Sequence, residues 1–157
     1  MNIADPLRLV DHLQTHGLRV VVIGGHAVNA HGYMRTTEDV DCLLVKTDGW
    51  QPRLFTALQE LNAFYITDEI DPQTGIERVR PIDEVYVATR QLLMVGTDLG
   101  YLDLFVFVPN CPELSAEEVW NTAITIAGRR FANIVVLRRL KTAAGRPRDL
   151  DDLTNLP

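Results

Sequence analysis

The sequence predicts a mixed α/β (α+β) fold, in which helices flank a mixed, mainly antiparallel sheet of about five strands. Three observations predict this class. Residues 18–23 form a continuous, largely β-branched run, which is typical of a strand covered on both faces. Leucine and valine side chains recur at helical spacing in segments 4–16 and 50–62, as they do in amphipathic helices. The turn at residues 97–100 separates two apolar runs and indicates a β-hairpin.

Taken in order, the elements fit this class. The helix over residues 4–16 ends at Gly17, a common C-terminal cap. The strand that follows stops at Gly24 and Gly25, which open a short helix. Further strands are expected at residues 39–45, 63–67, 92–97 and 101–108, and further helices at residues 50–62, 84–91, 115–122, 134–144 and 147–156.

Two segments are harder to assign. Residues 68–83 are polar, acidic and rich in turn residues, so we expect a loop that can hold a short hairpin and has the freedom to gate a cleft. Residues 123–132 alternate like a strand across Gly128. No repeat, low-complexity tract or long linker divides the chain, and we expect residues 1–157 to form a single domain.

Composition and charge narrow the class of protein. The chain has no apolar run long enough to span a membrane, and its N-terminus lacks a secretory signal pattern, so we expect a cytoplasmic protein. Its net charge of −6 weighs against a long nucleic acid as the main ligand, although basic residues near the C-terminus keep RNA open. An acidic protein that handles nucleoside triphosphates needs a bound cation to offset repulsion.

Asp39 and Asp41 give the sharpest chemical signal. They lie two residues apart at the start of a strand, so both side chains leave the same face, about 7 Å apart. A divalent metal is an economical partner for two such carboxylates, and Mg²⁺ prefers oxygen ligands. The alternative is that the two aspartates are simply exposed at the strand start.

Two further features of the sequence add a phosphate-binding turn and a third carboxylate to this pair. Backbone N–H groups at Gly24 and Gly25, at a helix start, can hold phosphates, although a glycine pair is also an ordinary tight turn. Asp103 is the lone charge in the apolar strand 101–108, where an unpartnered carboxylate is rare. If that strand lies beside residues 39–45, three carboxylates converge, and Asp103 is the natural general base.

These pieces, in this order, resemble the DNA polymerase β-like nucleotidyltransferase superfamily. The matching residues are the Gly-Gly-His-Ala of segment 24–27, the Arg-x-Thr-x-Asp-Val-Asp of segment 35–41 and the Leu-Lys-Thr-Ala-Ala-Gly-Arg tail that starts segment 140–153. The tail is similar to that of small bacterial members, including abortive-infection-type nucleotidyltransferase toxins. The resemblance covers most of the chain and is most specific over residues 24–44.

The resemblance implies a metal-dependent active site. In that superfamily the two aspartates of the motif and a third acid on a later strand bind metal, so Asp39, Asp41 and Asp103 become the expected catalytic and metal-binding residues. Two Mg²⁺ ions are expected, with Mn²⁺ as a substitute. Such ions activate an attacking oxygen and steady the leaving pyrophosphate.

The resemblance also implies a nucleotide site. Gly24 and Gly25 would contact the triphosphate. Arg35 and Thr37 would touch phosphate or orient the metal-binding loop.

The C-terminal tail adds two basic residues to that site. Lys141 and Arg146 match tail positions that can reach the nucleotide. Equally, they can pair with Asp149 or Asp152 and lock the last helix.

The expected reaction is transfer of a nucleoside monophosphate from an NTP to a hydroxyl or phosphate acceptor. The acceptor is left open among a small molecule, a protein and tRNA. Two alternatives remain: a catalytically silent binding module of a toxin–antitoxin-like pair, and a metal-dependent phosphatase or nuclease. The hairpin edges of the sheet allow a homo-oligomer or an antitoxin-like partner.

The four histidines have different expected roles. His26 can touch phosphate or fill the helix start. His12, His16 and His31 show no metal-like spacing and are expected to be surface or helix residues.

Overall fold

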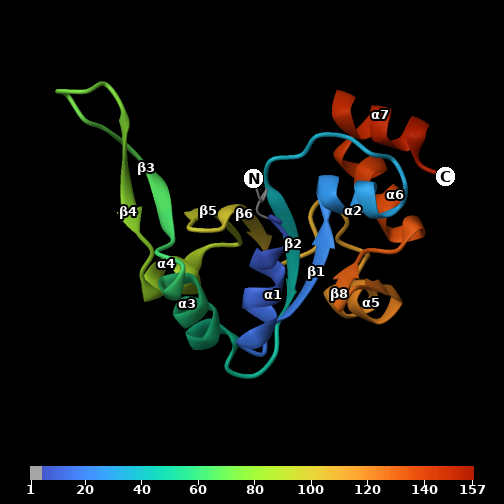
Figure 1. The fold of residues 1–157 in the computed structure, drawn as a ribbon, viewed down its shortest axis with the longest axis horizontal. Helices are drawn as coiled ribbons and strands as arrows, with labels where there is room; N and C mark the ends of the chain where they lie inside the picture. Colours follow the sequence, from blue (N-terminus) through green and yellow to red (C-terminus); the bar gives the residue numbers. More distant parts are fainter. Residues whose placement is uncertain (1–4) are drawn as a thin grey trace.

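The computed structural model describes residues 5–157, and this part of the chain forms one eight-stranded sheet with helices packed against it (Figure 1). The strand order is β4-β3-β5-β6-β2-β1-β8-β7. The strands are β1 (Arg19–Ile23), β2 (Val40–Val45), β3 (Phe64–Ile70), β4 (Glu77–Pro81), β5 (Leu92–Thr97), β6 (Gly100–Phe105), β7 (Ile124–Ile126) and β8 (Arg129–Phe131). The helices are α1 (Arg8–Thr15), α2 (Gly24–Ala30), α3 (Trp50–Glu60), α4 (Glu84–Thr89), α5 (Ala116–Thr122), α6 (Ile134–Ala144) and α7 (Pro147–Asn155).

The strand number expected from the sequence, about five, is wrong, because segment 68–83 was interpreted mainly as a loop and residues 123–132 as a single strand-like segment. The polar segment 68–83 contributes the end of β3 and all of β4, which pair as one antiparallel hairpin. Residues 123–132 split into β7 and β8 at Ala127 and Gly128, whose positive φ angles of 51° and 77° reverse the chain. The sheet is mixed as expected: β1–β8 and β2–β6 are parallel, and the other pairings are antiparallel.

The helices lie where the sequence placed them, with tighter bounds. Residue 4, the first of the helix expected over 4–16, lies outside the described residues. Asp83, Ser115 and Asn133 accept hydrogen bonds from the first turns of α4, α5 and α6, which fixes where these helices begin. Gly145, with φ +63°, ends α6.

Both faces of the central strands are buried. Along β1, Val20 and Val22 point into a large core that includes α1, α3 and α4, whereas Val21 and Ile23 point into a smaller core that includes α5 and α6. This double burial confirms the interpretation of residues 18–23 as a fully covered strand. Residues at the ends of these central strands are therefore attached to a part of the sheet that is packed on both faces.

The β3–β4 hairpin extends away from the rest of the molecule (Figure 1). Its apolar side chains Ile66, Ile70 and Val79 are exposed. The hairpin joins the main sheet where Phe64 pairs with Gly96, whose missing side chain leaves room for the Phe64 ring. Among residues 5–157, no helix combines the length and apolar character needed to cross a membrane.

Candidate active site

The register of the three central strands brings two carboxylates side by side. Ile23 of β1 pairs with Asp41 of β2, and Asp41 pairs with Asp103 of the parallel strand β6. The sequence left open whether the strand carrying Asp103 lies next to β2, and the structure places it there. Neighbouring strands lie about 4.8 Å apart, so the two aspartates start from adjacent points.

A cavity of about 690 Å³ opens over this point, within the size range of small-ligand sites. Every site residue expected from the sequence lines it. These residues are Gly24, Gly25, Arg35, Thr37, Asp39, Asp41, Asp103, Lys141 and Arg146. Residues from segments 24–41 and 141–146, far apart in the sequence, therefore line the same cavity as Asp103.

The carboxylates in the cavity repel one another. Burial and the nearby charge of Asp103 raise the pKa of Asp41 to about 7. Burial, followed by the charge of Asp39, also raises the pKa of Asp103. Negative charge on all three residues at neutral pH therefore needs a cation from outside the chain.

The donor set fits a hard divalent cation, although the three carboxylates do not form a tight three-ligand group. Within residues 5–157, the group of three ligand side chains whose donor atoms all lie within 4.8 Å of one another is a different one, His12, His16 and Glu60. The donor atoms of Asp39, Asp41 and Asp103 therefore do not all lie that close to one another. Mg²⁺ is typically held by one or two carboxylates together with waters and substrate phosphates, so a looser set still suits it.

Gly24 and Gly25 are needed because other side chains press against them. Gly24 has φ +71°, and a Cβ there would lie 2.1 Å from Asp41 Oδ2. A Cβ at Gly25 would lie 2.5 Å from Thr37 Oγ1. The glycine pair therefore lets both the β2 carboxylate and the loop before β2 close against the start of α2.

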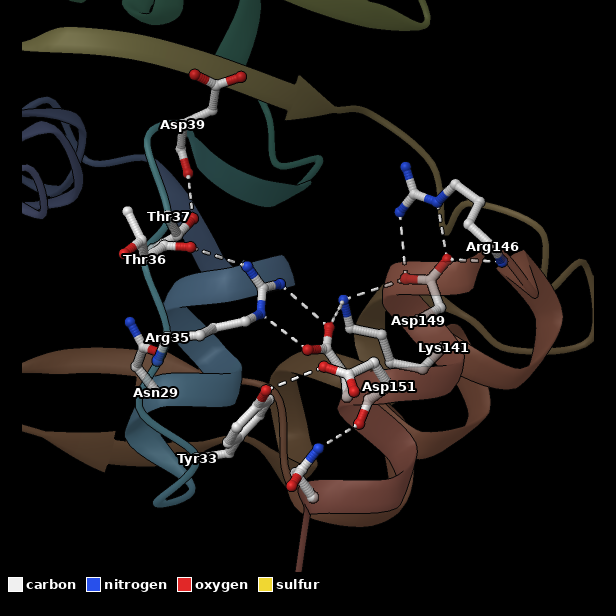
Figure 2. Close-up of polar contacts among 12 residues, drawn as sticks. Asn29, Tyr33, Arg35, Thr36, Thr37, Asp39, Lys141, Arg146, Asp149 and Asp151 are labelled. Carbon is white, nitrogen blue, oxygen red and sulfur yellow. Dashed lines mark hydrogen bonds and ion pairs between the residues drawn. The ribbon is translucent and has the colours of Figure 1, made fainter.

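Arg35 fixes that loop to the C-terminal helix. Its Nε and Nη2 donate to the two oxygens of Asp152 at 2.8 and 3.1 Å, a bidentate pair. The backbone N–H of Arg35 also donates to Asn29 of α2. Figure 2 shows the guanidinium group of Arg35 pointing toward Lys141, away from the Asp39 carboxylate.

Lys141 and Arg146 make the ion pairs that the sequence left as one of two options. Lys141 is 5% exposed, and its Nζ lies 2.9 Å from Asp152 Oδ2 and 3.3 Å from Asp149 Oδ1. Arg146 Nε donates to Asp149 Oδ2 at 2.7 Å (Figure 2). Burial alone would raise the pKa of Asp149, but the contacts with Arg146 and Lys141 outweigh it and lower that pKa.

The two cations differ in exposure. The Arg146 side chain is 71% exposed at the edge of the cavity, whereas Lys141 is enclosed. Arg146 therefore keeps donors free for a ligand, and Lys141 has its ammonium committed to two carboxylates.

On one wall of the cavity, sequence reasoning identified Lys141 and missed its neighbours. Leu137, Leu140, Lys141 and Ala144 line it from α6, spaced as one face of a helix. That spacing was a usable signal, because it places Lys141 on the same face as two leucines. The remaining lining residues that were not predicted as site residues are Ile23, Thr36, Glu38, Phe105, Pro109, Asn110, Arg148 and Asp149.

The contacts of the histidines differ from those expected from the sequence. The statement that His12 and His16 lack metal-like spacing is wrong: they lie four residues apart, His12 within α1 and His16 at its C-terminal cap, and group with Glu60. His31 Nε2 lies 2.8 Å from the carbonyl oxygen of Ala132. His26 is not among the residues that line the cavity, and its Nε2 is buried without a hydrogen-bond partner among the described residues.

Comparison with known proteins identifies a solved structure that shares this fold. Neither a protein-family profile nor a curated protein sequence matches the chain. Among solved structures, the antibiotic-resistance factor ANT(2'')-Ia aligns with 94% of this chain and 80% of its own, at 15% identity and a TM-score of 0.53. The chain therefore shares the fold of that protein.

Two Helicobacter pylori proteins align more loosely. JHP933 aligns at 19% identity with 93% of this chain, which spans 62% of its length, at a TM-score of 0.46. A protein described as a nucleotidyltransferase candidate aligns at 19% identity with 87% of this chain and 56% of its own, at a TM-score of 0.41.

Proposed function

We propose that this chain is a metal-dependent nucleotidyltransferase that moves a nucleoside monophosphate from an NTP to an acceptor hydroxyl or phosphate. The observation that carries the proposal is the in-register pair Asp41 and Asp103, with Asp39 beside it, in the cavity that Gly24 borders. The fold shared with ANT(2'')-Ia and the motif resemblance of residues 24–41 support it.

Asp39, Asp41 and Asp103 would hold Mg²⁺, with two ions expected and Mn²⁺ as a substitute. The bound metal would supply positive charge to the phosphates and to the attacking and leaving oxygens. Asp103 would accept the proton of the acceptor hydroxyl, a role suited to a carboxylate whose pKa burial has raised. Catalysis would otherwise consist of positioning and electrostatic stabilisation.

The remaining site residues would divide between contact and support. Gly24 and Gly25 would let the triphosphate approach the backbone at the start of α2. Arg146 would meet a phosphate, because it is exposed at the cavity edge. Arg35 and Lys141 would act through Asp152 to hold the loop and the tail around the nucleotide, with Thr37 packed against Gly25.

The acceptor class follows from charge. A net charge of −6 favours a small molecule or a protein over a long nucleic acid, and ANT(2'')-Ia, which shares the fold, is an antibiotic-resistance factor. We propose a small-molecule acceptor with protein and tRNA as the other candidates, a cytoplasmic location, and a single domain over residues 1–157.

The test of this site is nucleotide binding. Isothermal titration with each NTP in the presence of Mg²⁺ should show binding by the wild-type protein and loss of binding in Asp39→Ala and Asp41→Ala. Asp68→Ala is the matched control, because Asp68 is an exposed acid on β3 away from the cavity. Absence of wild-type binding at millimolar NTP would refute the proposal. Binding without chemistry would favour the silent module instead.

A further inference from the structure

His12 of α1 and His16, the C-terminal cap of α1, meet Glu60 at the end of α3. The two imidazole rings are 5.0 Å apart between centroids. Glu60 Oε2 lies 2.6 Å from His16 Nε2 and 3.4 Å from His12 Nε2. A donor atom from each of the three residues lies within 4.8 Å of the other two. We call these three residues the α1–α3 cluster.

The α1–α3 cluster is separate from the cavity. His16 closes α1 just before β1 begins at Arg19, whereas the cavity lies at the opposite end of β1, where Ile23 pairs with Asp41. Five strand residues span roughly 16 Å. None of the three residues lines the cavity.

We propose that the α1–α3 cluster binds a divalent transition metal of the Zn²⁺ class and joins α1 to α3. Two imidazoles and one carboxylate are a donor set for Zn²⁺ or Co²⁺, whereas Mg²⁺ prefers oxygen ligands alone. The side chains of His12 and His16 are 22% and 20% exposed and that of Glu60 is 51% exposed, so metal can enter and water can complete its shell.

One contact competes with the metal. His12 Nε2 lies 2.8 Å from the carbonyl oxygen of Ala57, in the last turn of α3, where backbone carbonyls lack partners within the helix. Metal binding through that nitrogen exchanges this hydrogen bond for a coordinate bond and leaves the single N–H of the neutral imidazole on Nδ1. For His16, the polar contact recorded within residues 5–157 is the one with Glu60, so His16 is the cleaner test position.

The test measures metal affinity in a protein whose cavity is already disabled. In the Asp41→Asn background, Co²⁺ should bind with the visible absorption of a site with nitrogen ligands, Zn²⁺ should displace it, and Mg²⁺ should not. Zn²⁺ should also raise the melting temperature, since it links two helices of the folded state.

Variants then locate the site. His16→Ala and the near-isosteric Glu60→Gln should each weaken Zn²⁺ binding at least about tenfold, and His16→Ala should abolish the Zn²⁺-dependent rise in melting temperature. His31→Ala is the matched control, because His31 bonds to Ala132 and lies outside the cluster. Zn²⁺ affinity that is unchanged in His16→Ala, or equally weakened in His31→Ala, would overturn the proposal.

Discussion

At position 24, the backbone conformation and the neighbouring Asp41 side chain both require a glycine. The φ of +71° disfavours any residue with a Cβ, and the Asp41 carboxylate occupies the place where that Cβ would stand. The glycine thus serves the geometry of Asp41 whether or not a phosphate is bound. The sequence alone suggested only the phosphate role or a tight turn.

Gly24→Ala should therefore cost more than an ordinary glycine substitution. We expect a loss of about 3 kcal/mol in the free energy of unfolding, because strain and displacement of Asp41 add together. Gly49→Ala is the matched control: its φ is +73°, but nothing lies within 4 Å of the added Cβ, so only about 1 kcal/mol should be lost. Denaturant unfolding of both variants gives the comparison, and equal losses would mean that the contact with Asp41 does not matter.

The pKa of Asp41 predicts a pH effect on the metal-free protein. Its pKa is raised to about 7 in the folded state from an ordinary value of 3.8, because of burial and the charge of Asp103. The folded state then binds the proton more tightly than the unfolded state. The stability that this group contributes is complete below pH 4 and is lost as pH rises toward 7.

Asp41→Asn should consequently stabilise the chelator-treated protein at pH 8 by about 1 to 2 kcal/mol and should have little effect at pH 4. Thermal unfolding across this pH range measures it, with the exposed Asp68→Asn as control. Addition of Mg²⁺ should close the gap by stabilising the wild type. A less stable Asp41→Asn variant at pH 8 would contradict the repulsion described at the cavity.

At the scale of elements, ion pairs tie the loop at residues 31–39 to the two C-terminal helices. In Figure 1 this loop passes over the end of α2 before it enters β2. Asp149 and Asp152 of α7 are fully buried and receive Lys141 of α6, while Asp152 also receives Arg35 of the loop. Buried charges of this kind depend on every partner being present.

Lys141→Ala should cost about 2 to 4 kcal/mol, because it leaves two buried carboxylates short of a cation, although Arg35 and Arg146 still contact them. Arg139→Ala is the control on the same helix. Its pair with Glu113 is exposed, and its removal should change stability by no more than about 0.5 kcal/mol. A neutral Lys141→Ala would show that this lysine is free for ligand binding rather than committed to α7.

At the scale of the whole molecule, local patterns predicted the elements better than their pairing. The β-branched run of residues 18–23 and the caps at Ser115 and Asn133 specified β1, α5 and α6, because these signals are local. The eight-stranded sheet was underestimated because polar segment 68–83 and the three-residue strands β7 and β8 carry little hydrophobic periodicity. Their strand character depends on partners elsewhere in the sheet.

In the candidate site, too, residues close together in sequence were predicted, whereas contacts between distant segments were not. The Asp39–Asp41 pair and the glycines stand close together in sequence, so their chemistry was visible in one short segment. Contacts such as Arg35 with Asp152 join residues 117 positions apart. The grouping of Glu60 with the histidines of α1 likewise depends on how α1 and α3 pack. Such contacts depend on tertiary packing, for which the sequence offers no local signal.

The central claim is nucleotidyl transfer through Asp39, Asp41 and Asp103, and pyrophosphate release tests it most directly. Wild-type protein with Mg²⁺, α-labelled NTPs and a cell extract should release pyrophosphate and place the label on one acceptor. Asp103→Asn should reduce the rate at least about a hundredfold, as expected for loss of a general base, with NTP binding retained. Release of inorganic phosphate without pyrophosphate, or an unchanged rate in Asp103→Asn, would contradict the account.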